Sequence, residues 1–225
     1  MGGALDRRKR RLVEALKREG VVRSRELEEA ILRVPREEFV PERYRSEAYD
    51  DHPLPLLKGQ TISAPHMCAM MCEALGLRRG DRVLEVGTGS GYHAALCAEM
   101  VSPTGEPLEG YVVSLELHPE LARYAHENLK RTGYDDRVHV IACDGSAGPP
   151  VRSRFDKVLV TAAAPTIPPP LVEALADEGR MVIPVGPEYI QDLVLVVKRG
   201  GEVFRRSLGG CVFVALKGKY GFGLR

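Results

Sequence analysis

The segment VLEVGTGSGYHAA at 83–95 constrains the fold most, because a short apolar run leads into three glycines and then into a helical pattern. Glycines at Gly87, Gly89 and Gly91 let the backbone turn tightly and approach a ligand closely, and the new helix offers unpaired N–H groups. A dinucleotide fingerprint G-x-G-x-x-G requires glycine at 92, where Tyr92 stands. The segment therefore predicts a strand, a glycine turn and a helix at a ligand site, with a purely structural turn as the alternative.

From Asp81 onward, short β-branched runs alternate with helical patterns, which predicts an α/β fold with a parallel sheet and crossover helices. After Gly186 the runs follow one another directly, which favours an antiparallel extension of that sheet. The expected parallel strands are 83–86, 111–117, 138–142, 157–161 and 180–185, and the expected later strands are 192–199, 202–208 and 211–217. The expected helices between them are 92–100, 119–131 and 168–176.

The first part of the chain has a different pattern. Residues 6–19 and 24–33 predict two short amphipathic helices, the second with Ser24 as a possible N-cap. The stretch 35–65 is rich in proline and predicts a long irregular segment. A length of 225 residues favours one domain, with an N-terminal helical and loop region (1–80), a cofactor-binding core (81–186) and C-terminal strands (187–225).

The composition excludes several classes of protein. Hydrophobic residues make up 44% of the chain and charged residues 28%, without an apolar run of transmembrane length. The net charge of +1 gives no general electrostatic attraction to nucleic acid or to a membrane. The five scattered cysteines form no C-x-x-C pair, so we expect a cytoplasmic protein with neither disulfides nor a metal site, and the N-terminus does not predict a secretory signal. Cys68 and Cys72 are expected to pack in the core, and the chain is expected to be a monomer.

The pattern G-x-G-x-G is associated with S-adenosylmethionine in sheets of this type, and two acids support that cofactor. Glu116 stands at the end of the second strand, 29 positions after Gly87, where it can accept hydrogen bonds from ribose hydroxyls. This spacing exceeds the usual ~20 residues, and an insertion at 102–110 explains the excess. Asp144 and Gly145 follow the third strand and offer an acceptor for the adenine amine and a close approach. Taken alone, Glu116 could also be a solvated acid at the end of a strand, and Asp144 with Gly145 could also be a turn.

Six motifs together resemble one enzyme family. They occur in the family's order between about residues 20 and 216. The motif GQTISAPHM is more specific for the family than the glycine turn is. The motifs are VPREEFVP (34–41), AYDDHPLPL (48–56), GQTISAPHM (59–67), VLEVGTGSGYHAA (83–95), KVLVTAAAP (157–165) and RMVIPVGP (180–187). The chain thus resembles the protein-L-isoaspartate O-methyltransferases.

The resemblance implies a Rossmann-like S-adenosylmethionine-dependent methyltransferase fold, with a rearranged order of the last strands and an N-terminal helical addition over the active site. It implies methyl transfer from S-adenosyl-L-methionine, leaving S-adenosyl-L-homocysteine, to the α-carboxyl of L-isoaspartyl residues and less well of D-aspartyl residues. The substrates are damaged proteins and peptides. The resulting ester closes to a succinimide, which reopens partly to normal aspartate.

The resemblance also implies roles for residues near GQTISAPHM. Ser63 matches the family's active-site serine and would orient the substrate carboxylate, although it is equally placed to cap the following helix. Thr61 and Ile62 would lie beside substrate and cofactor. His66 either contacts the carboxylate or caps the helix. A general base is unnecessary, because the accepting carboxylate is already ionised at neutral pH.

Further assignments concern the strand ends. Glu85 would accept a hydrogen bond from the cofactor's amino group or from a neighbouring backbone donor. Backbone groups near Val214 would pair with the substrate peptide as an added strand does. Two positions depart from the family pattern, since Ala215 replaces a usual proline and Cys68 stands where relatives carry histidine or valine.

Two other functions stay open at this stage. The first is methyl transfer to RNA or to a small molecule on the same fold, for which RRKRR at 7–11 is the best support. The second is a non-catalytic module that binds S-adenosylmethionine. Labelling of an isoaspartyl peptide separates both from the repair enzyme.

Overall fold

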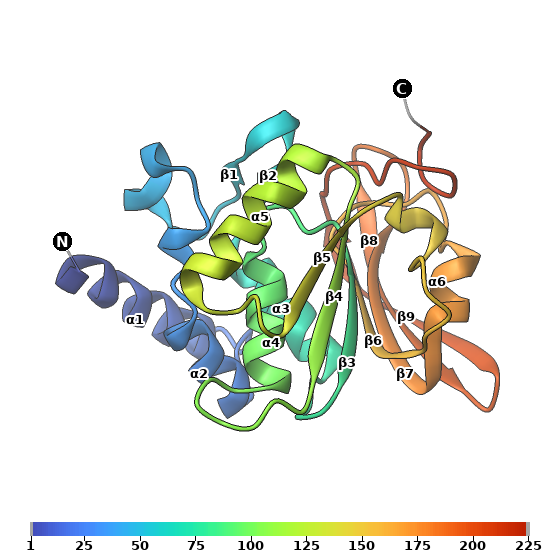
Figure 1. The fold of residues 1–225 in the computed structure, drawn as a ribbon, viewed down its shortest axis with the longest axis horizontal. Helices are drawn as coiled ribbons and strands as arrows, with labels where there is room; N and C mark the ends of the chain where they lie inside the picture. Colours follow the sequence, from blue (N-terminus) through green and yellow to red (C-terminus); the bar gives the residue numbers. More distant parts are fainter. Residues whose placement is uncertain (1, 224–225) are drawn as a thin grey trace.

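The centre of the computed structural model, which describes residues 2–223, is a sheet of seven strands in the order β5-β4-β3-β6-β7-β8-β9 (Figure 1). The first five of these strands in the chain are parallel to their neighbours, and β8 and β9 are antiparallel. The strands are β3 (Arg82–Val86), β4 (Tyr111–Glu116), β5 (Val138–Ala142), β6 (Phe155–Val160), β7 (Leu175–Val185), β8 (Gln191–Arg199) and β9 (Glu202–Cys211). The predicted fold class is confirmed, and the last strands follow one another in chain order at one edge.

The sheet separates two apolar layers, which explains its strand sequences. In β3, Val83 packs into the larger layer with the N-terminal helices, while Leu84 and Val86 pack into the smaller layer with α6 (Pro169–Ala174). Strands buried on both faces have nearly continuous apolar sequences, as 83–86 does apart from Glu85. Strand residues therefore contribute to both cores at once, and the carboxyl ends of β3, β4 and β6 meet at one edge.

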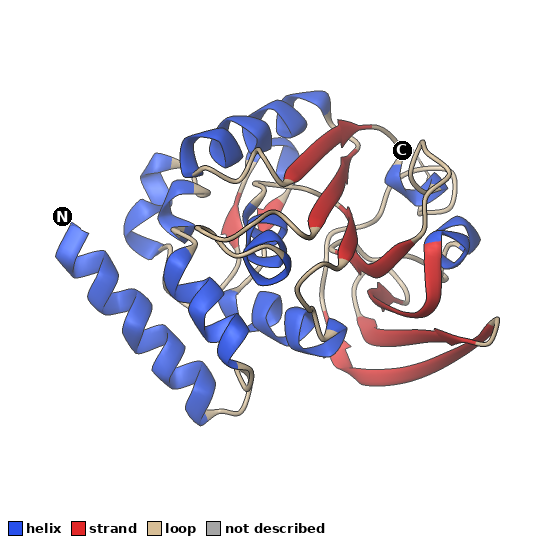
Figure 2. Cartoon of the chain, turned by 60° about the horizontal axis from the view of Figure 1, so that its bottom comes forward, coloured by secondary structure: helices blue, strands red, loops and turns tan. Residues whose placement is uncertain are grey.

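Helices cover both faces of this sheet (Figures 1 and 2). The larger layer holds α3 (Pro65–Leu75), α4 (Tyr92–Val101) and α5 (Pro119–Thr132). Proline begins α5 and α6 as predicted, because its missing N–H is unpaired in a first turn anyway. Helix α6 ends at Ala174, earlier than predicted, because the next residue already pairs with Phe155 of β6.

The N-terminal helix α2 (Arg25–Arg33) packs against α4, and α1 (Gly2–Arg18) packs against α2 (Figure 2). Ser24 stands at the N-cap position of α2, but its hydroxyl donates to Glu73 of α3 at 2.8 Å and does not cap the helix. The proline-rich stretch contains three short 3-10 helices, η1 (Arg36–Glu38), η2 (Glu42–Glu47) and η3 (Leu57–Gly59), and the two-stranded hairpin of β1 (Leu54–Pro55) and β2 (Thr61–Ile62).

The prediction of a strand at 211–217 is wrong. Strand β9 ends at Cys211, and the chain then turns back to the carboxyl end of β6, where Ala163 and Ala215 form a single parallel bridge. The N–H of Ala163 donates to the Val214 carbonyl at 2.8 Å, and the Phe213 N–H donates to the Gln191 side chain at 2.8 Å. The alternating pattern CVFVALK therefore buries residues against the sheet edge without joining the ladder.

Glu99 of α4 holds several layers together. Its carboxylate, 3% exposed, accepts from Arg33 of α2 at 2.6 Å, from the Thr104 hydroxyl at 2.6 Å and from the Tyr134 hydroxyl at 2.9 Å. The insertion at 102–110 and the end of α5 are thereby tied to the N-terminal helices. In the part of the chain that the structure describes, no helix is long and apolar enough to cross a membrane.

Replacement of Glu99 by alanine tests this network. Glu99→Ala leaves the buried Tyr134 hydroxyl without its acceptor and removes the ion pair with Arg33, so we expect the free energy of unfolding to fall by about 3 kcal/mol. Urea denaturation measures the change. The control is Glu106→Ala, which removes a largely exposed ion pair with Arg79 and should have little effect. Equal effects of the two substitutions would contradict this account.

Candidate active site

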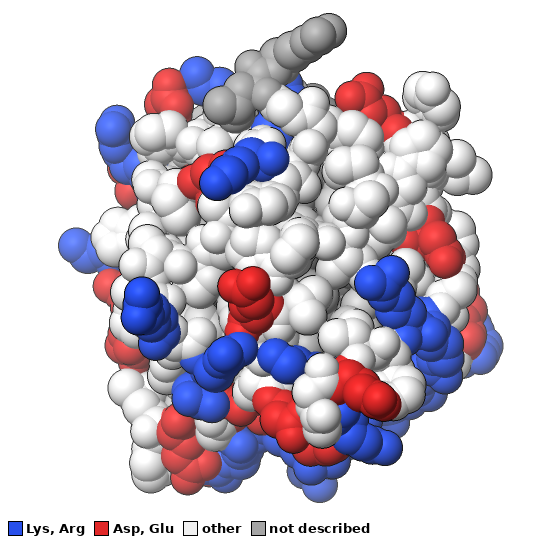
Figure 3. All heavy atoms as spheres, turned by 90° about the vertical axis from the view of Figure 1, so that its right-hand side faces the viewer, with Lys and Arg blue, Asp and Glu red and all other residues white. Residues whose placement is uncertain are grey.

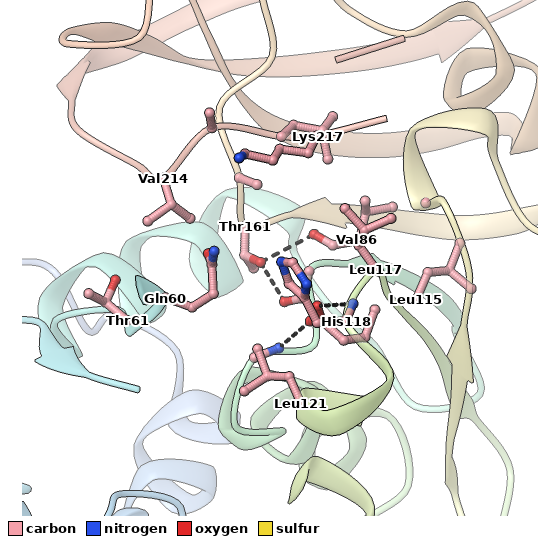
Figure 4. A pocket seen from close by; sticks show the side chains of 17 residues that line it. Gln60, Thr61, Val86, Leu115, Leu117, His118, Leu121, Thr161, Val214 and Lys217 are labelled. Carbon is pink, nitrogen blue, oxygen red and sulfur yellow. Dashed lines mark hydrogen bonds between the residues drawn. The ribbon is translucent and has the colours of Figure 1, made fainter. Parts of the chain in front are cut away.

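The glycine turn after β3 is shaped for close approach. Gly87 has φ +99°, and a side chain there would overlap with the Thr161 hydroxyl at the end of β6. That hydroxyl donates to the Gly87 carbonyl at 2.6 Å, which ties the turn to the neighbouring strand (Figure 4). Gly91, with φ +87°, starts α4 close to Leu129 of α5. Only glycine fits these conformations without strain, so the turn keeps its backbone open to a ligand.

Glu116 fixes the other side of the turn. One carboxylate oxygen accepts from the Gly89 N–H at 3.0 Å, and the other accepts from the His118 N–H at 3.0 Å (Figure 4). Each carboxylate oxygen has two lone pairs, so the group retains acceptor capacity after these bonds. The acid at the end of β4 thus both shapes the turn and lines the cleft beside it.

The turn opens on a cleft, which Figure 4 shows from close by. It lies at the carboxyl edge of the parallel strands, where open α/β sheets bind ligands. Four of the predicted cofactor residues besides Glu116 line it, and they come from three different segments: Thr61, Gly87 with Gly89, and Gly145. The remaining wall includes Leu115, Thr161 and Val214.

A second hollow, here called the groove, adjoins the cleft. One side of the groove is formed by Pro53, Ser63, His66 and Met67, and the other side is formed by residues 210–214. Thr61, Thr161 and Val214 line both cleft and groove. A smaller hollow behind them is lined by Ile62 and Ser63 together with Thr61 and Thr161. The structure therefore brings the cofactor and substrate residues predicted from GQTISAPHM to one junction.

The cap of α3 differs from the prediction. Ala64, and not Ser63, is the N-cap residue, and the Asp51 carboxylate accepts from the His66 N–H at 2.9 Å in the first turn. The same Asp51 oxygen lies 2.9 Å from His66 Nδ1 and orients the ring. Among residues 2–223, no hydrogen bond to the Ser63 hydroxyl is formed. Neither Ser63 nor the His66 side chain is used to cap the helix, so both can serve the groove.

Comparison with known proteins decides the family. The profile described as "Protein-L-isoaspartate(D-aspartate) O-methyltransferase (PCMT)" matches residues 7–221. A protein-L-isoaspartate O-methyltransferase of Hyperthermus butylicus is 55% identical over 95% of this chain and 90% of its own length. One of Korarchaeum cryptofilum is 51% identical over 94% of this chain and 98% of its own length. The chain belongs to the protein-L-isoaspartate O-methyltransferase family.

A solved structure agrees with this assignment. A crystal structure described as a protein-L-isoaspartate O-methyltransferase of Plasmodium falciparum in complex with S-adenosyl-L-homocysteine matches with a TM-score of 0.81 and 31% identity. The match covers 91% of this chain and 96% of that one. The Rossmann-like methyltransferase fold predicted from the motifs is confirmed, and with it membership of a family of S-adenosylmethionine-dependent enzymes.

Two acids that were predicted to bind the cofactor accept hydrogen bonds from other residues of this methyltransferase. Glu85 is fully buried and does not line the cleft, and it accepts a hydrogen bond from the Ser114 hydroxyl. Burial raises the pKa of Glu85 to about 7. Asp144 accepts from the Ser146 N–H at 2.9 Å and from the Lys219 N–H at 2.8 Å. Asp144 does not line the cleft itself, and its hydrogen bonds fix the turn that contains Gly145. The cofactor roles of Glu85 and Asp144 stay predictions.

Sequence reasoning missed Arg36, which the structure places under the active-site loop. Its side chain is fully buried, donates to the Ala48 carbonyl at 2.7 Å and to the Ser63 carbonyl at 2.8 Å, and lies 4.8 Å from the centre of the Tyr92 ring. One guanidinium thus joins the proline-rich segment, the loop before α3 and the start of α4. The motif VPREEFVP contained the signal, because a buried arginine requires several acceptors, but the motif did not say which.

Lysine at position 36 tests this role. Arg36→Lys retains the charge, but a lysine cannot donate to the Ala48 and Ser63 carbonyls at once as the planar guanidinium does. The loop that contains Ser63 should therefore shift. A displacement of about 1 Å lowers turnover by as much as ~10²-fold. We therefore expect kcat to fall strongly while the Kd of S-adenosylmethionine, held mainly by the turn, stays nearly unchanged. Arg43→Lys, on the exposed side of η2, serves as control. Unchanged kcat, or a parallel loss of cofactor affinity, would contradict the positioning role.

Proposed function

We propose that this chain transfers the methyl group of S-adenosyl-L-methionine to the α-carboxyl of L-isoaspartyl residues, and less well of D-aspartyl residues, in damaged proteins. The ester then closes to a succinimide, and hydrolysis restores part of the material to aspartate. The observation that carries the proposal is the junction at Thr61 and Thr161, which connects the cleft beside the glycine turn with the groove that contains Ser63. Family membership supplies the identity of donor and acceptor.

The cleft fits S-adenosylmethionine. The backbone of Gly87 and Gly89 lies open beside it, and Glu116 keeps acceptor capacity for ribose hydroxyls. Gly145, which would lie on the adenine side, packs its backbone directly against β3 and β4, because a side chain there would overlap with Val86. Thr61 and Ile62 would border the sulfonium end. When bound, the cofactor supplies an activated methyl group, and the protein supplies its orientation.

The reaction requires alignment and not proton transfer. An isoaspartyl α-carboxylate is ionised at neutral pH, so its oxygen attacks without a base. The protein must hold the acceptor oxygen within about 3 to 3.5 Å of the methyl carbon, in line with the sulfur. The Ser63 hydroxyl would donate to one carboxylate oxygen and leave the other free to attack. His66, oriented by Asp51, would contact the same carboxylate from the groove.

The far wall of the groove suits an unfolded or extended substrate. Val212 is 73% exposed, and residues 212–214 form no regular ladder in the structure. Backbone N–H and C=O groups in such an extended segment recognise another peptide irrespective of its side chains. A repair enzyme meets isoaspartate in many sequence contexts, so recognition by the backbone around Val214 fits this role.

Methyl transfer to RNA receives less support. In the segment 7–11, Arg8 pairs with Asp50 and Arg10 pairs with Asp6, so part of this basic run is neutralised within the protein. On the face shown in Figure 3, basic and acidic side chains are interspersed. We propose that the enzyme acts as a cytoplasmic monomer without nucleic acid, and that the groove accepts protein. A non-catalytic binding module would not need a groove joined to the cofactor cleft.

Two matched peptides test the function. They differ only in L-isoaspartate or L-aspartate at one position, and the donor carries a labelled methyl group. We expect base-labile label in the isoaspartyl peptide alone. Label in neither peptide, with cofactor binding intact, would contradict the proposal and favour another acceptor or a binding-only role.

Replacement of Ser63 tests the mechanism. Ser63→Ala removes the donor that orients the carboxylate, and loss of one such donor lowers kcat by about 10²-fold. Cofactor affinity, measured by calorimetry, should remain close to that of the wild type. Ser46→Ala, in η2 outside the groove, is the control. Wild-type kcat in Ser63→Ala would remove the serine from its catalytic role.

A further inference from the structure

Three soft metal-binding side chains meet between α3 and α4. Cys72 of α3 and His93 and Cys97 of α4 bring their ligand atoms within 4.8 Å of one another, and all three side chains are buried. His93 and Cys97 are four residues apart on one helix face, and Cys72 faces them from the other helix. The sequence alone shows each helix separately, so it predicted core packing and could not show this convergence.

The spacing fits a tetrahedral ion. Cys72 Sγ lies 3.4 Å from His93 Nε2. Bond lengths of 2.3 Å to sulfur and about 2.0 to 2.1 Å to nitrogen at a tetrahedral angle place these atoms about 3.6 Å apart. Two cysteines and one histidine occur together as ligands of zinc sites, and two thiolates with a neutral imidazole balance the charge of a divalent ion.

The surroundings supply what a metal-bound histidine needs. His93 Nδ1 and Glu85 Oε1 are both buried without a hydrogen-bond partner among the described residues. A carboxylate that pairs with the far nitrogen of a ligating imidazole is the usual second contact of such sites. Two orphan polar atoms are otherwise costly in an apolar core.

Cys68 lies one turn before Cys72 on α3, but its sulfur is not among the ligand atoms that lie within 4.8 Å of one another. Its thiol lies 3.8 Å from the Ser63 carbonyl.

We propose that Cys72, His93 and Cys97 bind one structural zinc(II) ion. Binding displaces the thiol protons to solvent and forms no other product. The ion joins α3, which follows the Ser63 loop, to α4, which follows the glycine turn. It lies behind the smaller hollow, whose wall includes Cys68 and His93, and it takes no part in methyl transfer.

Metal content tests the site directly. The protein is produced in medium with added zinc chloride, purified without chelator and passed through gel filtration, and zinc is measured by elemental analysis. We expect one zinc per chain, and cobalt(II) in place of zinc should give the absorption of a tetrahedral thiolate complex. Loss of the ion should lower Tm by about 5 °C or more.

Variants distinguish this site from adventitious binding of zinc elsewhere on the protein. Cys72→Ala and Cys97→Ala should each lose the stoichiometric metal and the cobalt–thiolate absorption, while Cys143→Ala, at a thiol remote from α3 and α4, should keep both. Retained binding of S-adenosylmethionine shows that the variants fold. Wild-type protein without stoichiometric zinc would overturn the proposal, as would metal that persists in both Cys72→Ala and Cys97→Ala or that depends on Cys143. None of these outcomes depends on the proposed methyl transfer.

Discussion

The active site depends on one buried guanidinium. The Arg36 side chain donates to the carbonyls of Ala48 and Ser63 and covers the Tyr92 ring, so it joins three segments that the sheet does not hold. Buried arginine is stable only with such partners, and each partner here is a backbone group or an aromatic face. The proline-rich segment can remain irregular because this interaction and the Asp51 cap of α3 fix its ends.

The opposite half of the site is fixed by the sheet. Parallel strands bring Gly87, Glu116 and Thr161 to one edge. The Gly89 N–H donates to Glu116 and the Thr161 hydroxyl donates to the Gly87 carbonyl, and these two hydrogen bonds set the glycine turn. The cofactor side is therefore held by the hydrogen bonds between strands of the sheet, and the substrate side is held by the side-chain contacts of Arg36 and Asp51. A reaction that proceeds by alignment alone requires both, since the methyl donor and the carboxylate come from different halves.

The sequence predicted the parts of the fold that follow from local patterns. Apolar runs located β3, β4 and β5 within one or two residues, and the glycines located the turn, because these features depend on burial and φ alone. The run at 211–217 has the same alternation but meets the sheet edge by a single bridge, so the pattern alone was misleading. Arg36, Thr161 and the cysteine cluster could not be assigned, since their partners lie in distant segments. Local sequence likewise could not show that Asp51 caps the helix after Ser63.

A crystal structure of the protein with S-adenosyl-L-homocysteine and an L-isoaspartyl peptide tests the central claim most directly. The account predicts the homocysteine sulfur at the junction between Thr61 and Thr161, facing a peptide α-carboxylate that accepts a hydrogen bond from Ser63. The peptide backbone should run beside residues 212–214. A peptide bound away from the groove, or a sulfur directed away from the junction, would contradict it.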